Sequence, residues 1–255
     1  VHNSVDVIAK IIERDENLNS PNNKRAAKLR AKTVMFDEMT PSIIMAGFPM
    51  LDWIDIAMSP VCLPGEVDQN ANIMYVDAAE RMGLAADVCP LPSAEVGCAI
   101  VDDYPQVGSS FITSSMPCDG SLGAALFMDR YMKKLPSFTL TPPQRFNEPE
   151  TNAYAVKDLK NCIRFIEETY DVKWDWDAFW KKAEEYNKTT QCMLDKWDVN
   201  CTPYPQVIGS ALSLQREYEF QTAACLDSFM TKQDEKVTKM MLKGYEDCLL
   251  YTSDA

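Results

Sequence analysis

The stretch 109-SSFITSSMPCDGSLGAALFMDRYMKKLP-136 decides the fold of this chain. It starts with SSFITSS, a short run of the kind that forms a buried strand, and continues into GSLGAALFMDRYMKKL, which has helical spacing. The next segment, 137-SFTLTPP-143, predicts a second strand that the two prolines end. A strand, a helix and a strand in this order predict parallel strands joined by a right-handed crossover.

The same alternation extends toward the N-terminus. The segment 54-IDIAMSPV-61 predicts another strand, and 71-ANIMYVDAAERMG-83 predicts a helix with Met74, Ala78 and Met82 on one face. We therefore expect an α/β fold, with a parallel Rossmann/flavodoxin-like lobe over residues 34–150.

The flanking regions have a different character. Residues 1–33 are charged and polar and predict an N-terminal helical arm, whereas residues 151–248 predict a helical region. In that region 175-DWDAFWKKAEEYNKTTQCMLDKW-197 predicts a long helix with an apolar core stripe, capped by Asp175 or Asp177. The last residues, 249–255, resemble the translation of a sequencing adapter, and we expect them to be a non-native tail.

Charge and histidine content exclude several classes of function. The formal net charge of -13 argues against a nucleic-acid backbone or an anionic membrane as the main partner. We expect a cytoplasmic protein, because no apolar run is long enough to span a bilayer and the N-terminus lacks a signal-peptide pattern. The one histidine is His2, so catalytic pairs and metal sites built on histidine are excluded unless His2 reaches them. Metal chemistry would need thiolate or oxygen ligands.

Cys118 is the most informative of the nine cysteines, no two of which have CxxC spacing. It follows a predicted strand and precedes a predicted helix, where the helix N-terminus stabilises anions, including a thiolate. In a doubly wound sheet, ligands bind beyond the carboxyl ends of the strands. A small core residue, a nucleophile and a metal ligand remain open as roles for Cys118.

Cys89 belongs to the same edge if 85-AADV-88 is a short strand. Two thiolates that meet there, without an imidazole nearby, suit an iron–sulfur cluster or a thiolate metal site. Cys98, in the apolar run GCAIV, is predicted to be a core residue, and most cysteines of the helical region are predicted to be packing residues.

Several of these segments, taken in order, resemble one family. The runs 86-ADVCPLPSAEVG-97, 111-FITSSMPCDGS-121 and 137-SFTLTPP-143, with the helices that follow, resemble the 2-hydroxyacyl-CoA dehydratase / benzoyl-CoA reductase family. The resemblance spans roughly residues 35–248. It implies that Cys89 and Cys118 are two of three cysteine ligands of a [4Fe-4S] cluster. It places the third ligand in a second α/β lobe, which we expect beyond the end of this chain.

The resemblance also implies a reaction and partners. These dehydratases eliminate water from (R)-2-hydroxyacyl-CoA through a ketyl radical, after an ATP-dependent iron–sulfur activator protein injects one electron. The implied assembly is an oxygen-sensitive heterodimer with a homologous second subunit, of a type used in anaerobic amino-acid fermentation. Glu66, in CLPGE, falls where one family subunit carries an active-site glutamate, which makes it a candidate catalytic acid/base.

Two departures from that subunit keep other functions open. The chain has additional residues between MTPS and LPGE, and it has Asp37 and Glu38 where that subunit has a serine. The alternatives are a benzoyl-CoA reductase-type subunit and a non-catalytic, cluster-bearing electron-transfer or scaffold subunit.

Overall fold

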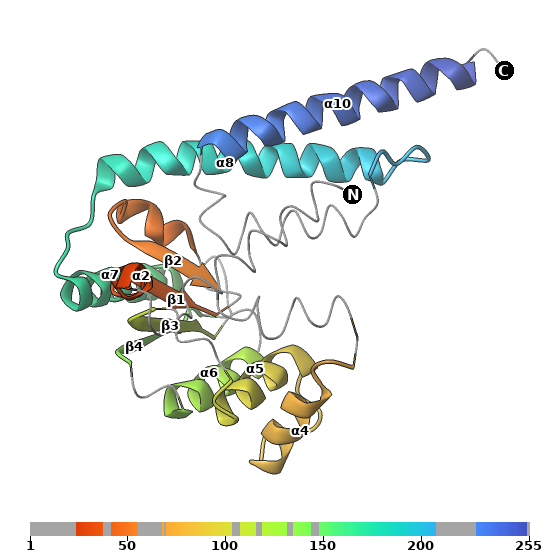
Figure 1. Ribbon diagram of the computed structural model, residues 1–255. Helices are drawn as coiled ribbons and strands as arrows, with labels where there is room; N and C mark the ends of the chain where they lie inside the picture. Colours follow the sequence, from red (N-terminus) through yellow and green to blue (C-terminus); the bar gives the residue numbers. More distant parts are fainter. Residues whose placement is uncertain are drawn as a thin grey trace. The chain divides into compact units, whose positions relative to one another are not determined.

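The computed structural model describes residues 24–37, 42–55, 68, 70–103, 108–115, 119–131, 135–143, 148–207 and 228–253. They belong to two compact units, one within Ile12–Trp174 and the other within Asp175–Ala255. The first contains the sheet and the second contains two long helices (Figure 1).

The first unit is built on a sheet of four parallel strands in the order β2-β1-β3-β4. The parallel α/β fold predicted from the sequence is therefore confirmed. β3 and β4 lie within the two segments read as strands, and β2 overlaps the start of the third. The bounds are β1 Thr33–Phe36, β2 Asp52–Asp55, β3 Ser110–Ser114 and β4 Ser137–Leu140.

Helices pack on one face of the sheet to form the main core. The side chains of Met35, Ile54 and Phe111 point to this face, because they are paired neighbours in the sheet register and share one buried cluster. The helices that meet them lie together on one side of the sheet (Figure 1). They are α4 (Ile73–Arg81), α5 (Pro90–Ile100) and α6 (Asp119–Tyr131).

The other face of the sheet receives α7 (Pro149–Tyr170). Phe138 of β4 contacts Phe165 of α7, with 5.6 Å between the ring centroids. Phe138 is paired with Ile112, whose side chain points to the face opposite that of Phe111. At the C-terminal end of α7, the Tyr170 hydroxyl donates a hydrogen bond of 2.8 Å to the carbonyl of Thr33, where β1 begins. α7 therefore fixes the amino end of β1, at the edge of the sheet opposite the carboxyl ends of the strands.

Two shorter elements precede and follow β1. They are the helix α2 (Lys24–Arg30) and the 3-10 helix η1 (Ser42–Gly47). Phe48, directly after η1, is fully buried and packs edge-to-face on Trp174, with the ring centroids 5.2 Å apart. This contact joins the segment between β1 and β2 to Trp174, which lies just after the end of α7.

The second unit pairs α8 (Trp176–Asn200) with α10 (Ser228–Ser253), which run side by side in the same direction (Figure 1). The Asp175 side chain accepts a hydrogen bond of 3.0 Å from the Ala178 amide, so Asp175 is the N-cap of α8 and Asp177 is not. The buried residues of α8 are Thr189, Lys196 and Val199. None of them belongs to the stripe predicted to be core, whose residues are half-buried or exposed: Phe179, Ala183, Tyr186, Thr190, Met193 and Trp197.

The local structure differs from the sequence-based expectations at four places. Residues 85–88 form a turn rather than a short strand, and the helix α5 begins directly after Cys89 where the sequence reading placed none. The strand β1 was also not predicted. On α4 the buried residues are Tyr75 and Ala79, whereas Met74 and Met82 are exposed.

The described residues leave some expectations untested. The arm predicted over residues 1–33 lies outside them except for α2 and the start of β1, and the domain boundaries and the suspected tail stay predictions. In the part of the chain that the structure describes, no helix combines the length and apolar composition that crossing a bilayer requires.

Candidate functional site

The strand order has a topological switch point between β1 and β3. The chain passes from β1 to β2 on one side, then crosses back to β3 on the other side of β1. In parallel sheets the connections leave in opposite directions at such a point, and ligands bind beyond the carboxyl ends of the two strands. Asp37 follows β1 at this edge, and Ser115 follows β3.

Backbone and side-chain hydrogen bonds hold this edge in place. The Asp37 carboxylate accepts a hydrogen bond of 2.7 Å from the Ser114 amide, and the Asp37 amide donates one of 3.1 Å to the Ile112 carbonyl. The Ser115 amide donates to Leu140 of β4 at 2.8 Å. The carboxyl end of β3 is thus fixed from both sides, three residues before Cys118.

Cys89 is exposed and stands at the N-cap of α5. Its carbonyl accepts hydrogen bonds from the amide and the hydroxyl of Ser93, at 3.3 and 2.9 Å, while its side chain makes no capping bond. The Cys89 sulfur is therefore accessible and is not used to cap the helix. α5 precedes the amino end of β3, so its own N-terminus lies toward the carboxyl edge of the sheet.

The first turn of α5 has few backbone N–H groups available to bind a ligand. Pro90 and Pro92 have no N–H, and the Ser93 amide already bonds to the Cys89 carbonyl. Within these residues, Leu91 supplies the one remaining backbone donor for a group bound at the helix N-terminus. An anion held by several amides is thus not favoured here, and the accessible thiol is the main chemical group of this turn.

The body of α5 is rigidly packed. Residues 92–99 are all buried, and a side chain on Gly97 would overlap the carbonyl oxygen of Tyr75 in α4. The Tyr75 hydroxyl donates a hydrogen bond of 2.7 Å to Asp103, just beyond the end of α5. Cys89 therefore stands at the end of a helix that has little freedom to shift.

The other two candidate residues lie outside the described residues. Cys118 directly precedes α6, and Glu66 falls between β2 and α4. α5 and α6 share the buried cluster of the first unit, through Ala94 and Val96 on α5 and Ala124 on α6. The helices that Cys89 and Cys118 precede are thus neighbours, which is the arrangement that a shared ligand would need.

Part of the chain is similar to a known protein family. The model of the 2-hydroxyglutaryl-CoA dehydratase D-component matches residues 65–235. The chain belongs to this family. A search of curated proteins gave no significant match.

Membership of the 2-hydroxyglutaryl-CoA dehydratase D-component family confirms the resemblance that the sequence showed, and makes the chain a dehydratase component. The matched region includes Glu66, Cys89 and Cys118 and begins after β2. The departures at Asp37 and Glu38 lie before it, so the match does not bear on them.

The described cysteines of this family member differ sharply in access. Cys98 and Cys162 are fully buried, and burial raises the pKa of each thiol to about 12. The expectation that Cys98 is a core residue is confirmed. Cys89 and Cys201 are exposed, and Cys201 follows the last residue of α8. Of the described cysteines in the first unit, Cys89 is the one with an accessible sulfur.

The described residues do not by themselves assemble a metal site. Among them, no three histidine, cysteine, aspartate or glutamate side chains converge on one point. Cys118 and Glu66 are not among the described residues. A thiolate site at the carboxyl edge would therefore take Cys89 together with residues that the structure does not describe.

Proposed function

We propose that this chain is a subunit of an iron–sulfur 2-hydroxyacyl-CoA dehydratase that eliminates water from (R)-2-hydroxyacyl-CoA. The observation that carries the proposal is the family match over residues 65–235, which contains both candidate thiols. The exposed sulfur of Cys89, at the start of a helix that packs against the helix after Cys118, supports it. The excess of acidic residues sets no obstacle to an anionic CoA ester held at a local site.

Cys89 and Cys118 would hold a [4Fe-4S] cluster, whose thiolate ligands match the chemistry of these side chains. When bound, such a cluster supplies an electron at low potential and an iron that acts as a Lewis acid toward a substrate oxygen. Cys89 suits this role because its sulfur is accessible and makes no hydrogen bond that caps the helix. The two prolines in the first turn of α5 also leave few backbone amides that could bind a competing anion.

The remaining roles follow from position. Asp37 holds the end of β3 and so restricts where the segment with Cys118 can begin. Glu66 would hold or accept the proton that leaves in the elimination, because a carboxylate is the usual group for this role when no imidazole is nearby. We also propose a homologous second subunit, an ATP-dependent iron–sulfur activator protein and a cytoplasmic location.

Iron binding tests the site. The full-length subunit, reconstituted anaerobically with iron and sulfide, should bind about four irons. Cys89→Ala and Cys118→Ala should each lower that number sharply, whereas Cys201→Ala, which removes an exposed cysteine of the second unit, should leave it unchanged. Unchanged iron content in both Cys89→Ala and Cys118→Ala would refute the assignment.

The reaction is tested separately. With its partner subunit and activator, the protein should release water from a 2-hydroxyacyl-CoA. Loss of the aromatic ring of benzoyl-CoA instead would favour a ring reductase. If the absorption spectrum of the cluster stays unchanged when either ester is added, an electron-transfer or scaffold subunit would be favoured.

A further inference from the structure

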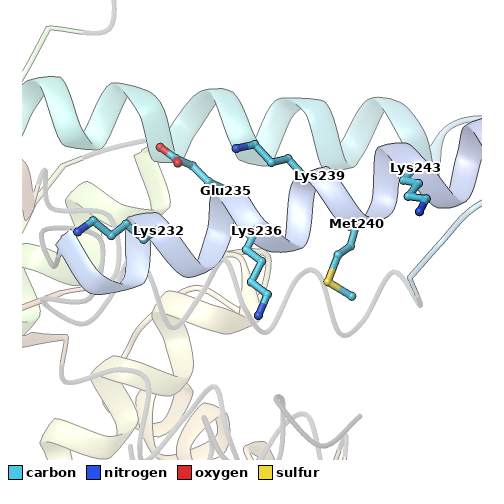
Figure 2. A pocket seen from close by; sticks show the side chains of 6 residues that line it. All are labelled: Lys232, Glu235, Lys236, Lys239, Met240 and Lys243. Carbon is cyan, nitrogen blue, oxygen red and sulfur yellow. The ribbon is translucent and has the colours of Figure 1, made fainter.

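Four lysines form a straight row along α10. Lys232, Lys236, Lys239 and Lys243 follow one another at intervals of four, three and four residues. At about 100° per residue these positions fall within about 60° of the helix circumference, and they span about 16 Å along the axis. Figure 2 shows these side chains along the helix, with Glu235 and Met240 beside them. We refer to the four as the lysine row.

The face of α10 opposite the lysine row is packed. The Thr238 hydroxyl donates a hydrogen bond of 3.4 Å to the Cys192 carbonyl of α8, and Met241 is 4% exposed. Both residues lie about half a turn around the helix from the row. α8 therefore supports α10 from behind, and the row is held on a straight, preformed helix.

The lysine row is exposed and positively charged. All four side chains are exposed, and the structure records no ion pair for them among the residues it describes. The six residues named above line a shallow open groove, and Glu235 is its one acidic member. In a chain of net charge -13, four lysines on one narrow stripe form a local reversal of sign.

We propose that the lysine row is a docking surface for an acidic helix of a partner protein. The charges are spread evenly over three turns instead of converging on a point, so the row matches a line of carboxylates at helical spacing better than one phosphate group. Met240, 65% exposed beside the row, supplies an apolar contact of the kind found at protein interfaces.

Nucleic acid fits the same surface less well. The row contains neither an arginine, the usual side chain for bidentate phosphate recognition, nor an aromatic ring on which a base would stack. The negative charge of the whole chain also opposes binding of a long polyanion. This inference does not depend on the proposed enzymatic function.

The test uses the full chain and two labelled synthetic helical peptides of equal composition. One carries glutamates at the i, i+4, i+7, i+11 spacing, and the other carries them distributed around the helix. Fluorescence anisotropy at low salt should show tighter binding of the first peptide. Lys236→Gln with Lys239→Gln should weaken that binding about fivefold, through the loss of two surface ion pairs.

The matched control is Lys157→Gln with Lys160→Gln, which removes the same charge from exposed positions of α7. It should leave peptide binding unchanged, and circular dichroism should show all variants equally folded. Equal binding of the two peptides, equal weakening by the control pair, or tighter binding of a single-stranded oligonucleotide would each overturn the proposal.

Discussion

The carboxylate of Asp37 accepts a hydrogen bond of 2.7 Å from the backbone amide of Ser114, which joins the ends of β1 and β3 at the edge where the candidate site lies. The bond forms where the backbone ladder between the two strands has ended. A side chain thus continues the pairing that the main chain no longer provides.

Asp37→Ala should lower the free energy of unfolding by about 1–3 kcal/mol, because the amide of Ser114, a residue that is 1% exposed, loses its acceptor. Asp37→Asn keeps an oxygen that can accept the same bond, so its loss should be clearly smaller. Urea denaturation followed by tryptophan fluorescence measures both. Equal losses in the two variants would show that the charge of Asp37 matters more than this bond.

The packing of α4 on α5 makes opposite predictions for two glycines. Gly97→Ala should destabilise the protein by about 1–3 kcal/mol, because its new methyl group overlaps the Tyr75 carbonyl, which is part of a helix backbone. Gly123→Ala in α6 meets nothing within 4 Å and should stabilise by up to about 1 kcal/mol. Thermal unfolding of the two variants compares them, and a neutral Gly97→Ala would contradict the close helix contact.

The N-cap of α8 gives a third prediction. Asp175→Ala should cost about 1 kcal/mol, since the amide of Ala178 loses the acceptor at 3.0 Å. Asp177→Ala, in the first turn of the same helix, should cost less, because it removes only a favourable charge near the helix N-terminus. Chemical denaturation of both variants checks the order, and a larger cost for Asp177→Ala would reverse the assignment of the cap.

The elements predicted correctly from the sequence are those with a clear local pattern. α4, α6, α7 and α8 carry helical spacing, and β3 and β4 are short apolar runs bounded by serine or proline. α5 was missed because it is buried all round and so shows no amphipathic pattern, and because its two prolines read as a loop. Proline at the first helical position was the signal that would have found it.

The candidate site was predictable in part, for a similar reason. Cys89 stood out because a short strand over residues 85–88 would have brought it to the same sheet edge as Cys118, although these residues form a turn. The bond from Asp37 depends on β1 and on the strand order, and both arise from long-range pairing that a four-residue run such as TVMF does not reveal. The sequence alone therefore pointed to thiols at the carboxyl edge of the sheet, but not to the Asp37 bond that joins β1 and β3 there.

Two buried thiols predict loss of stability in alkali. Burial raises the pKa of Cys98 and of Cys162 from 9.0 to about 12, so each thiol stays protonated in the folded chain while its unfolded counterpart ionises. Above about pH 9 the unfolded state then binds fewer protons than the folded state, and the free energy of unfolding falls as the pH rises.

Between about pH 8 and about pH 10 each of these thiols should remove about 1.4 kcal/mol from the free energy of unfolding. Cys162→Ala eliminates one of the two titrations, so its stability should fall less steeply over this range even though the variant starts from a lower value. Cys201→Ala removes an exposed thiol and should keep the slope of the unaltered protein. Urea denaturation at a series of pH values measures the three slopes, and identical slopes would show that Cys162 titrates equally in both states.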